Sequence, residues 1–398
     1  MNIAALRAAL LAVSAYKSIL SRPVMACVAR LIDALAAEKG EEALTAYTDL
    51  FYALRSEGHT GLGSWLAEAL RYDDSPYPRL VEQGGSDAAL ETAAERDVVT
   101  FTLLASVDCD MWLGKLAEIM GEDYQWLVSG LPRWENAAPF TFEWLTDCYR
   151  REGAGDFARY RAFVWEDETL IPVADPDCPT ADELLGYDWQ REEVAQNTRA
   201  LLSGRAVNNV LLYGESGTGK SATVKNLLTL PGMEDLRIIE ADKENLGGLP
   251  ALIRSLRGRR QKFIIFIDDL AFDRDDPTYS VLKTILEGGM ERRPNNVAVY
   301  ATSNRRHLVR QTISERAGDD MDRNETIQEK TSLADRFGVR ILFQGLNKAE
   351  FLTLVDMLAD RKGITTDREE LHRQAIIWER HHTAQTPRTA LQFVMSLN

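Results

Sequence analysis

The sequence contains few cysteines and no long apolar run. Its four cysteines, in 398 residues, form no C-x-x-C pair, which disfavours disulfides and a zinc site and predicts buried free thiols. No stretch approaches the roughly 18 apolar residues that a membrane-spanning helix needs, so we expect no membrane association. Segment 1–19 is rich in Ala and Leu, but it contains Arg7 and Lys17 and no A-x-A cleavage site. We interpret it as an amphipathic helix and expect a cytoplasmic protein.

Positive charge is scarce in the first half of the chain. Residues 1–180 contain 15 Lys and Arg against 29 Asp and Glu, whereas residues 181–398 contain 31 and 32. An acidic surface repels phosphate backbones, which argues against a nucleic-acid module in the first half. Helical spacing of apolar residues predicts an all-α domain over 1–165. This region contains six of the eight tryptophans of the chain, and we expect them to build its core. They are Trp65, Trp112, Trp126, Trp134, Trp144 and Trp165.

The most specific motif is a glycine-rich loop that matches the phosphate-binding pattern G-x-x-x-x-G-K-[ST]. It reads Gly214-Glu215-Ser216-Gly217-Thr218-Gly219-Lys220-Ser221. An apolar run precedes it and a helical pattern follows it, so backbone N–H groups and the helix dipole can both face a phosphate. We expect Lys220 to bind the β- and γ-phosphates of ATP and Ser221 to ligate Mg²⁺.

Downstream of this loop, short apolar runs alternate with helical patterns, which predicts a five-stranded parallel sheet. The predicted strands are 210–213, 237–240, 263–267, 297–301 and 339–343. We therefore expect an α/β core over 186–346 and a helical lid over 347–398. The stretch 166–185 contains three prolines and several acids, and we interpret it as an irregular linker to the N-terminal domain.

Polar side chains follow two of the predicted strands, at the sheet edge where such folds bind ligands. Asp268 and Asp269 directly follow the apolar run 263–267. We expect Asp268 to hold the metal and Asp269 to act as the general base. Asn304 ends the next strand and is a candidate for positioning the γ-phosphate or the attacking water. The alternatives are two surface acids and an asparagine in an ordinary turn.

Two arginines complete the set of candidates. Arg336 precedes the last strand, so it is better placed to reach the nucleotide of a neighbouring subunit than its own, as an arginine finger. The alternative is a surface arginine paired with Asp335. Arg388 begins a lid helix, where it either senses the nucleotide in the same subunit or lies on the surface. The charged loop 305–332 either becomes ordered when subunits meet or has no role.

Taken in order, these features resemble an AAA+ ATPase over residues 184–398. Segments 241–246, 266–270, 300–308 and 332–338 more narrowly resemble a bacterial AAA+ family of unassigned function. The resemblance implies ATP and Mg²⁺ as ligands, a helical N-terminal domain and homo-oligomers assembled through Arg336. The Asp-Asp pair departs from the Asp-Glu of most AAA+ motors and is similar to replication initiators of the DnaA type. Because the side chain of Asp269 is one methylene shorter, we predict slow hydrolysis.

Two functions remain open at this point. One is an ATPase that couples nucleotide state to self-assembly and to remodelling of a protein partner held by the N-terminal domain. The other is a nucleotide-gated DNA loader or adaptor, in which DNA would contact the basic residues Arg254, Arg257, Arg259, Arg260 and Lys262. A third function, a kinase-like P-loop protein that phosphorylates a small acceptor, is disfavoured by the positions of Arg336 and Arg388. A polypeptide-threading motor is disfavoured because segment 246–249 has no aromatic residue.

Overall fold

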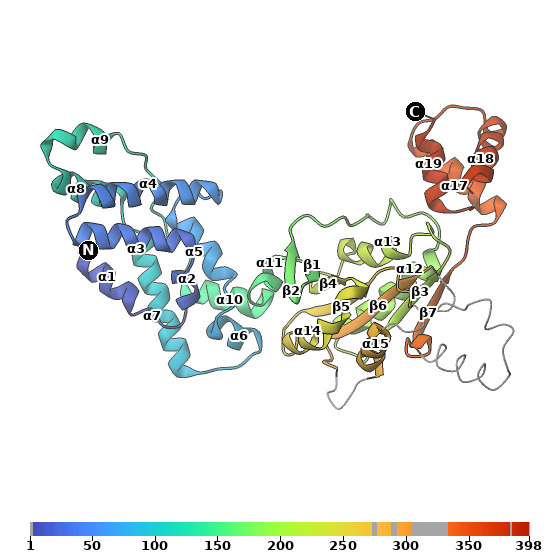
Figure 1. The fold of residues 1–398 in the computed structure, drawn as a ribbon, viewed down its shortest axis with the longest axis horizontal. Coiled ribbons are helices and arrows are strands. Elements are labelled where there is room, and N and C mark those ends of the chain that lie inside the picture. The colour runs from blue at the N-terminus through green and yellow to red at the C-terminus, as the bar shows by residue number, and fades with distance from the viewer. Residues whose placement is uncertain (1–2, 273–276, 288–292, 305–332, 383, 398) are drawn as a thin grey trace. The chain divides into compact units, whose positions relative to one another are not determined.

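The computed structural model describes residues 3–272, 277–287, 293–304, 333–382 and 384–397. The chain folds as two compact units, 1–159 and 160–398, which are described separately here (Figure 1). The sequence placed the boundary after residue 165, a few residues too late. The reason is that residues 162–166 form a strand that belongs to the sheet of the second unit.

The first unit is built from helices around one apolar core. Tyr16, Tyr47 and Tyr149 are among the side chains that this core buries completely. The helices are α1 Ile3–Leu11, α2 Lys17–Leu20, α3 Pro23–Ala36, α4 Gly40–Ser56, α5 Leu62–Arg71, α6 Pro76–Glu82, α7 Ala88–Ala105, α8 Cys109–Met120, α9 Gln125–Ser129, α10 Phe142–Glu152 and α11 Asp156–Arg159.

A buried carboxylate explains why the predicted helix over 1–19 is wrong. The chain forms α1 and α2 instead, and the break between them lies against Asp97 of α7. Asp97 Oδ2 accepts hydrogen bonds from the backbone N–H groups of Ser14, Ala15 and Tyr16 at 2.8, 2.6 and 3.3 Å. These bonds satisfy N–H groups that a continuous helix would have paired internally, so the turn is stable although it is buried.

The tryptophans divide between the core and the surface. Three of them are buried in the first unit as predicted: Trp65, Trp112 and Trp134. Trp165 is buried in the second unit. The prediction was wrong for Trp144 and most clearly for Trp126, which is 75% exposed.

The second unit contains a seven-stranded sheet, not the five-stranded one expected from the sequence. The strand order is β2-β1-β4-β5-β6-β3-β7, and all neighbours are parallel except the hairpin β1–β2. The five predicted strands are present. The strands are β1 Ala162–Glu166, β2 Thr169–Val173, β3 Val210–Gly214, β4 Leu236–Ala241, β5 Lys262–Ile267, β6 Val297–Ser303 and β7 Val339–Phe343.

The two additional strands lie at and beyond the start of the predicted linker. Pro172 lies in β2, at the edge of the sheet, where a strand tolerates the missing N–H group of proline. Trp165 of β1 is buried against the 3₁₀ helix η3, Lys243–Gly248, and its indole N–H donates to Asn245 O at 3.3 Å. A methyl group on Gly248 would approach the Trp165 ring to 2.9 Å. The hairpin therefore fixes the segment that follows β4.

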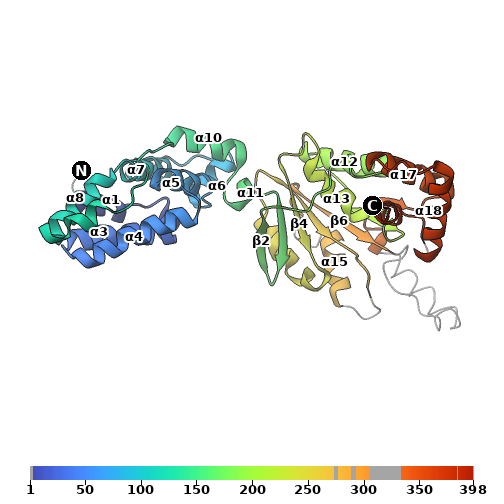
Figure 2. The ribbon, with the colours of Figure 1, turned by 90° about the horizontal axis from the view of Figure 1, so that it is seen from above.

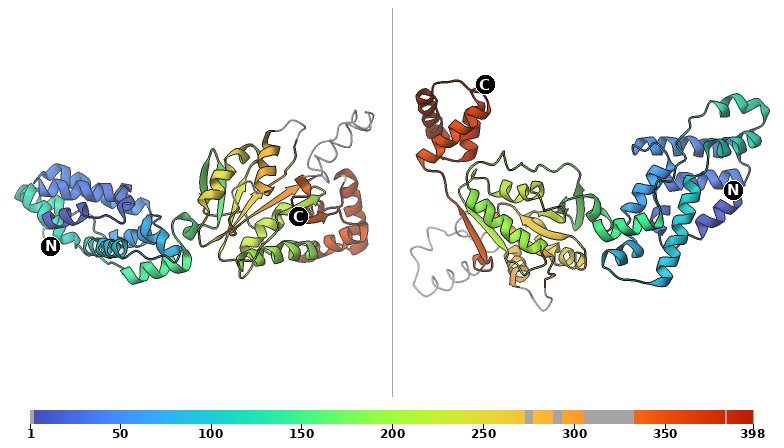
Figure 3. Two further views of the ribbon diagram at one scale, coloured as in Figure 1. Left: turned by 90° about the horizontal axis from the view of Figure 1, so that it is seen from below. Right: turned by 180° about the vertical axis from the view of Figure 1, so that it is seen from behind.

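Helices cover both faces of the sheet. Figures 2 and 3 show α12 (Asp188–Leu202) and α13 (Lys220–Asn226) on one face, and α14 (Leu249–Ser255) and α15 (Pro277–Glu287) on the other. The lid consists of α17 (Lys348–Arg361), α18 (Arg368–His382) and α19 (Pro387–Met395), which enclose a small apolar core. The 3₁₀ helices η1 and η2 are Glu122–Tyr124 and Leu227–Thr229.

Candidate nucleotide-binding site

The glycine-rich loop connects β3 to α13, as the motif requires. Gly214 adopts φ 140° at the end of β3, and a Cβ atom there would lie 2.0 Å from Phe343 O of β7. The next residue, Glu215, donates its N–H to the same carbonyl at 3.1 Å. Glycine is therefore required because the loop leaves the sheet in close contact with the neighbouring strand. Gly217 and Gly219 also adopt positive φ values, and Thr218 Oγ1 donates to Glu215 O at 2.8 Å.

Lys220 lies at the first turn of α13, and its side chain turns back over the loop. The residue is only 6% exposed, and Nζ donates to Gly214 O, Glu215 O and Asn304 Oδ1 at 3.1, 2.7 and 2.9 Å. Burial lowers the pKa of Lys220, while the carboxylates of Asp269 and Asp268 act in the opposite direction. The ammonium group is thus held inside the loop by neutral oxygen atoms, which a phosphate could replace.

Ser221 and Asp268 form the oxygen-rich part of the site. Ser221 Oγ donates to Asp268 Oδ1 at 2.6 Å. The same Oδ1 atom accepts from Thr302 Oγ1 at 2.5 Å and from the Asp269 N–H at 3.1 Å. A hydroxyl and a carboxylate in contact are the ligands that Mg²⁺ prefers, so these residues fit the ion that the sequence implied.

Asn304 links the loop to the candidate base. Its Oδ1 accepts from Lys220 Nζ at 2.9 Å, and its Nδ2 donates to Asp269 Oδ1 at 2.7 Å. Asp269 itself has φ 47°, a left-handed conformation that is uncommon outside glycine. The side chains predicted at the ends of β3, β5 and β6 therefore meet in one hydrogen-bonded group.

The lid also contacts the loop. The Arg388 N–H donates to Gly217 O at 3.3 Å, and a Cβ atom on Gly217 would lie 3.1 Å from Arg388 Cβ. Thr386, the N-cap of α19, lies equally close. The structure thus places Arg388 beside the phosphate-binding loop and not on a remote part of the lid surface.

Arg336 lies away from the nucleotide site of its own chain. β7 runs parallel to β3, with Val339 opposite Val210 and Phe343 opposite Gly214. The loop follows Gly214 while Arg336 precedes Val339, so the five-residue strand, roughly 17 Å long, separates them. Arg336 is exposed, and the Asp335 carboxylate accepts from Arg340 at 2.9 Å. Arg336 is therefore not placed to contact a nucleotide in the loop of its own chain.

Sequence inspection missed Thr302 as a site residue. It lies in β6, two residues before Asn304, which directly follows the strand. That spacing was the available signal, but its bond to Asp268 depends on the pairing of β6 with β5. The predicted loop 305–332 lies outside the described residues.

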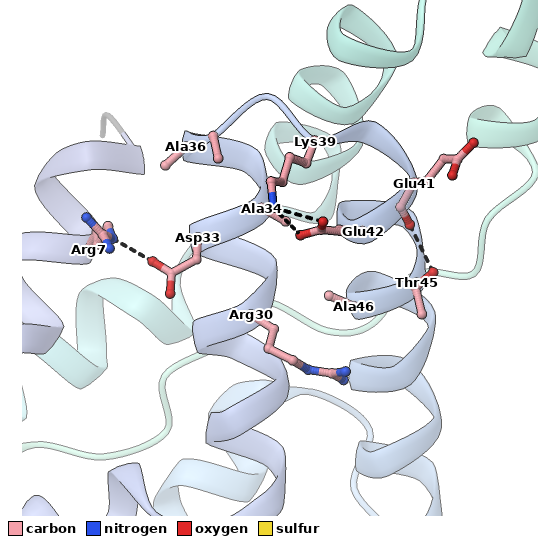
Figure 4. A pocket seen from close by; sticks show the side chains of 11 residues that line it. Arg7, Arg30, Asp33, Ala34, Ala36, Lys39, Glu41, Glu42, Thr45 and Ala46 are labelled. Carbon is pink, nitrogen blue, oxygen red and sulfur yellow. Dashed lines mark hydrogen bonds and ion pairs between the residues drawn. The ribbon is translucent and has the colours of Figure 1, made fainter.

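A hollow of about 760 Å³ lies in the first unit, among α1, α3 and α4 (Figure 4). Its lining contains three basic side chains, Arg7, Arg30 and Lys39, and three acidic ones, Asp33, Glu41 and Glu42, so it offers no excess of charge to a ligand. Arg7 pairs with Asp33 and Lys39 with Glu42 inside this lining, and Arg30 pairs with Asp49 outside it.

All four cysteines are free, as predicted, but only Cys109 and Cys148 are buried, whereas Cys27 and Cys178 are partly exposed. Within the described ranges, no cluster of three or more His, Cys, Asp or Glu side chains suits a metal ion. None of the helices in the described part of the chain is long and apolar enough to cross a membrane.

Comparison with known proteins gives a family and a fold. The model of the family described as "Protein of unknown function (DUF815)" matches residues 158–398, more than half of the chain. No curated protein matches the sequence. The similar solved structures include the Thermotoga maritima RuvB Holliday junction branch migration motor, at 17% identity and TM-score 0.36, and two of its variants at 17% and 0.37. Each match covers 54% of this chain and 63% of the other.

These matches are too distant to transfer a function. The strand order β4-β5-β6-β3-β7, with the phosphate-binding loop after β3, is itself the P-loop α/β core that the AAA+ resemblance implied. The core of the chain therefore has the AAA+ type of fold.

Proposed function

We propose a function for this chain, which belongs to the DUF815 family of proteins of unknown function, from the geometry of its phosphate-binding site. The protein binds ATP with Mg²⁺ and hydrolyses it slowly, and its nucleotide state controls self-assembly and the remodelling of a protein partner. The observation that carries this proposal is the hydrogen-bonded group that joins Lys220, Asn304, Asp269, Asp268 and Ser221.

Each residue of this group has a task that its position supports. Lys220 exchanges its bonds to loop carbonyls for bonds to the β- and γ-phosphates, and Arg388 reports from the lid on whether they are present. Ser221 and Asp268 hold Mg²⁺, which neutralises charge on the phosphate oxygens. Asp269 takes a proton from the attacking water, and Asn304 sets the direction of its carboxylate.

Slow hydrolysis follows from the state of Asp269. Its Oδ1 atom already accepts the amide of Asn304, and its side chain is too short to extend far beyond the backbone. The amide orients the carboxylate, and only the lone pairs that this bond leaves open can accept a proton from water.

Self-assembly rests on the placement of Arg336. This exposed arginine lies a strand length from its own loop, so it can complete only the site of an adjoining copy. We expect ATP to promote oligomers in the wild type and Arg336→Ala to hydrolyse ATP at least about 100-fold more slowly, since arginine fingers contribute more than that. Arg340→Ala is the matched control, because Arg340 is an exposed arginine nearby that pairs with Asp335.

The decisive experiment measures mass and ATP hydrolysis with wild type, each variant and a mixture of Lys220→Ala with Arg336→Ala. The first variant cannot bind nucleotide but carries the arginine; the second binds nucleotide but lacks it. The mixture should recover part of the lost activity. Unchanged assembly and hydrolysis in Arg336→Ala would contradict the role in trans.

The first unit is the proposed partner-binding module. Trp126 is 75% exposed and Tyr124 about half exposed, beside the acidic residues Glu122 and Asp123. Exposed aromatic residues of this kind are enriched at protein interfaces. Among the basic residues required by the DNA hypothesis, Arg260 pairs with Asp235 at 3.2 Å and Arg254 donates to Pro250 O at the same distance. These contacts support a protein partner over DNA.

A further inference from the structure

We propose that Thr302 is a positioning residue that fixes the Asp268 carboxylate and thereby sets the affinity of the nucleotide site for Mg²⁺. The inference rests on the proposed function and assigns a role to a residue that acts only through Asp268. Its basis is a chain of two hydrogen bonds whose direction is fixed by chemistry.

The direction of this chain follows from what each group can donate. The Asp269 N–H only donates and reaches Thr302 Oγ1 at 2.9 Å. The hydroxyl therefore accepts there and gives its single proton to Asp268 Oδ1, 2.5 Å away. The Thr302 hydroxyl has no second proton to donate, so its orientation is fixed by the Asp269 N–H on one side and by Asp268 Oδ1 on the other.

The effect on Asp268 is to hold one oxygen and leave the other open. Oδ1 accepts from Ser221 Oγ, from Thr302 Oγ1 and from the Asp269 N–H. Among the described residues no hydrogen bond reaches Oδ2. A carboxylate whose Oδ1 is held by three donors has a fixed plane, and its second oxygen is left for the ion and its ligands.

The position of Thr302 in the sheet makes this support rigid. Thr302 lies opposite Leu212 of β3, and the pairing of Ile267 with Ala301 brings Asp268 next to it. It is almost completely buried between the strand of the phosphate-binding loop and the strand of Asp268. Ser221, the other hydroxyl on Oδ1, is itself a metal ligand, whereas Thr302 influences the ion only through the carboxylate.

The same hydroxyl also stabilises the backbone of Asp269. That residue has φ 47°, and its N–H points at both Thr302 Oγ1 and Asp268 Oδ1. Removing the hydroxyl therefore disturbs the orientation of the metal-binding carboxylate and the turn that carries the candidate base. Only the first effect changes the dependence of nucleotide binding on Mg²⁺.

The test compares Thr302→Val, which keeps the shape but removes the hydroxyl, with Thr302→Ser, which keeps the hydroxyl. Binding of a fluorescent ADP analogue is titrated with Mg²⁺ and repeated in EDTA, so that the measurement does not depend on hydrolysis. We expect the Mg²⁺ concentration at half-saturation to rise about tenfold or more in Thr302→Val. Thr302→Ser should stay within about twofold of wild type, and binding in EDTA should be unchanged in both.

Ser303→Ala is the matched control. Ser303 is the next residue of β6 and equally buried, but its hydroxyl donates to Leu270 O at 2.8 Å and not to a carboxylate. We expect this variant to lose stability without a change in Mg²⁺ dependence. If Thr302→Val does not fold, Thr302→Ala takes its place with the same expected result.

Three results would overturn the role of Thr302. They are an unchanged Mg²⁺ dependence in Thr302→Val, an equal loss of binding in EDTA, and a Thr302→Ser variant that behaves like Thr302→Val. A wild-type protein that binds no nucleotide would overturn the proposed function itself, and this inference with it. The two failures are therefore distinguishable.

Discussion

Replacing Asn304 by alanine should slow hydrolysis without abolishing nucleotide binding. The amide bonds Lys220 at 2.9 Å and Asp269 at 2.7 Å, and both partners carry charge. A hydrogen bond to a charged group contributes about 1.5–3 kcal/mol. If the bond to Asp269 is needed in the transition state, the rate falls by about 10- to 150-fold, at 1.36 kcal/mol per factor of ten.

Phosphate release and ADP binding, measured together, separate the two tasks of Asn304. The variant should retain ADP affinity in Mg²⁺ within about threefold, because the orientation of Asp269 matters only when water attacks, so its loss lowers kcat and leaves binding intact. Asn296→Ala is the control at the other end of β6, where the amide donates to the carbonyls of Leu256, Arg259 and Gln261. It should destabilise the protein without this selective loss. Wild-type turnover in Asn304→Ala would refute the reasoning.

Two further pairs of variants test the first unit by urea unfolding. Trp65→Ala should lower the free energy of unfolding by about 3–5 kcal/mol because the side chain is buried, whereas Trp126→Ala should change it by less than about 0.5 kcal/mol. Equal losses would show that Trp126 packs against something in the free protein. Asp97→Ala leaves three backbone N–H groups without their acceptor and should cost at least about 3 kcal/mol. Asp49→Ala, which removes the exposed partner of Arg30, should cost less than about 1 kcal/mol, and a similar cost for both aspartates would contradict the capping role of Asp97.

The strands and the loop of the core were predictable because their signals are local. A phosphate-binding loop needs glycine, lysine and serine at fixed spacing, and β5 is apolar from Phe263 to Ile267 because both of its faces are covered there. The sequence also predicted that the side chains after β5 and β6 lie close together, since parallel strands end at the same edge of a sheet.

The missed features depend on partners distant in sequence. β1 pairs with β4, and β2 looked like a linker because an edge strand tolerates Pro172 and polar residues. The break between α1 and α2 depends on Asp97, more than eighty residues away. No local sequence pattern predicts which carboxylate accepts those N–H groups. The hydrogen bond from Thr302 to Asp268 is likewise unpredictable, because it depends on which strands are neighbours.

The central claim is that the loop around Lys220 binds a nucleotide phosphate. Calorimetric titration of ADP in Mg²⁺ into wild type, Lys220→Ala and Lys225→Ala tests it directly, because Lys225 lies on the same helix but pairs with Glu240. The account predicts binding in wild type and Lys225→Ala, and at least about 100-fold weaker binding in Lys220→Ala. Absence of binding in wild type, or equal affinity in all three proteins, would contradict it.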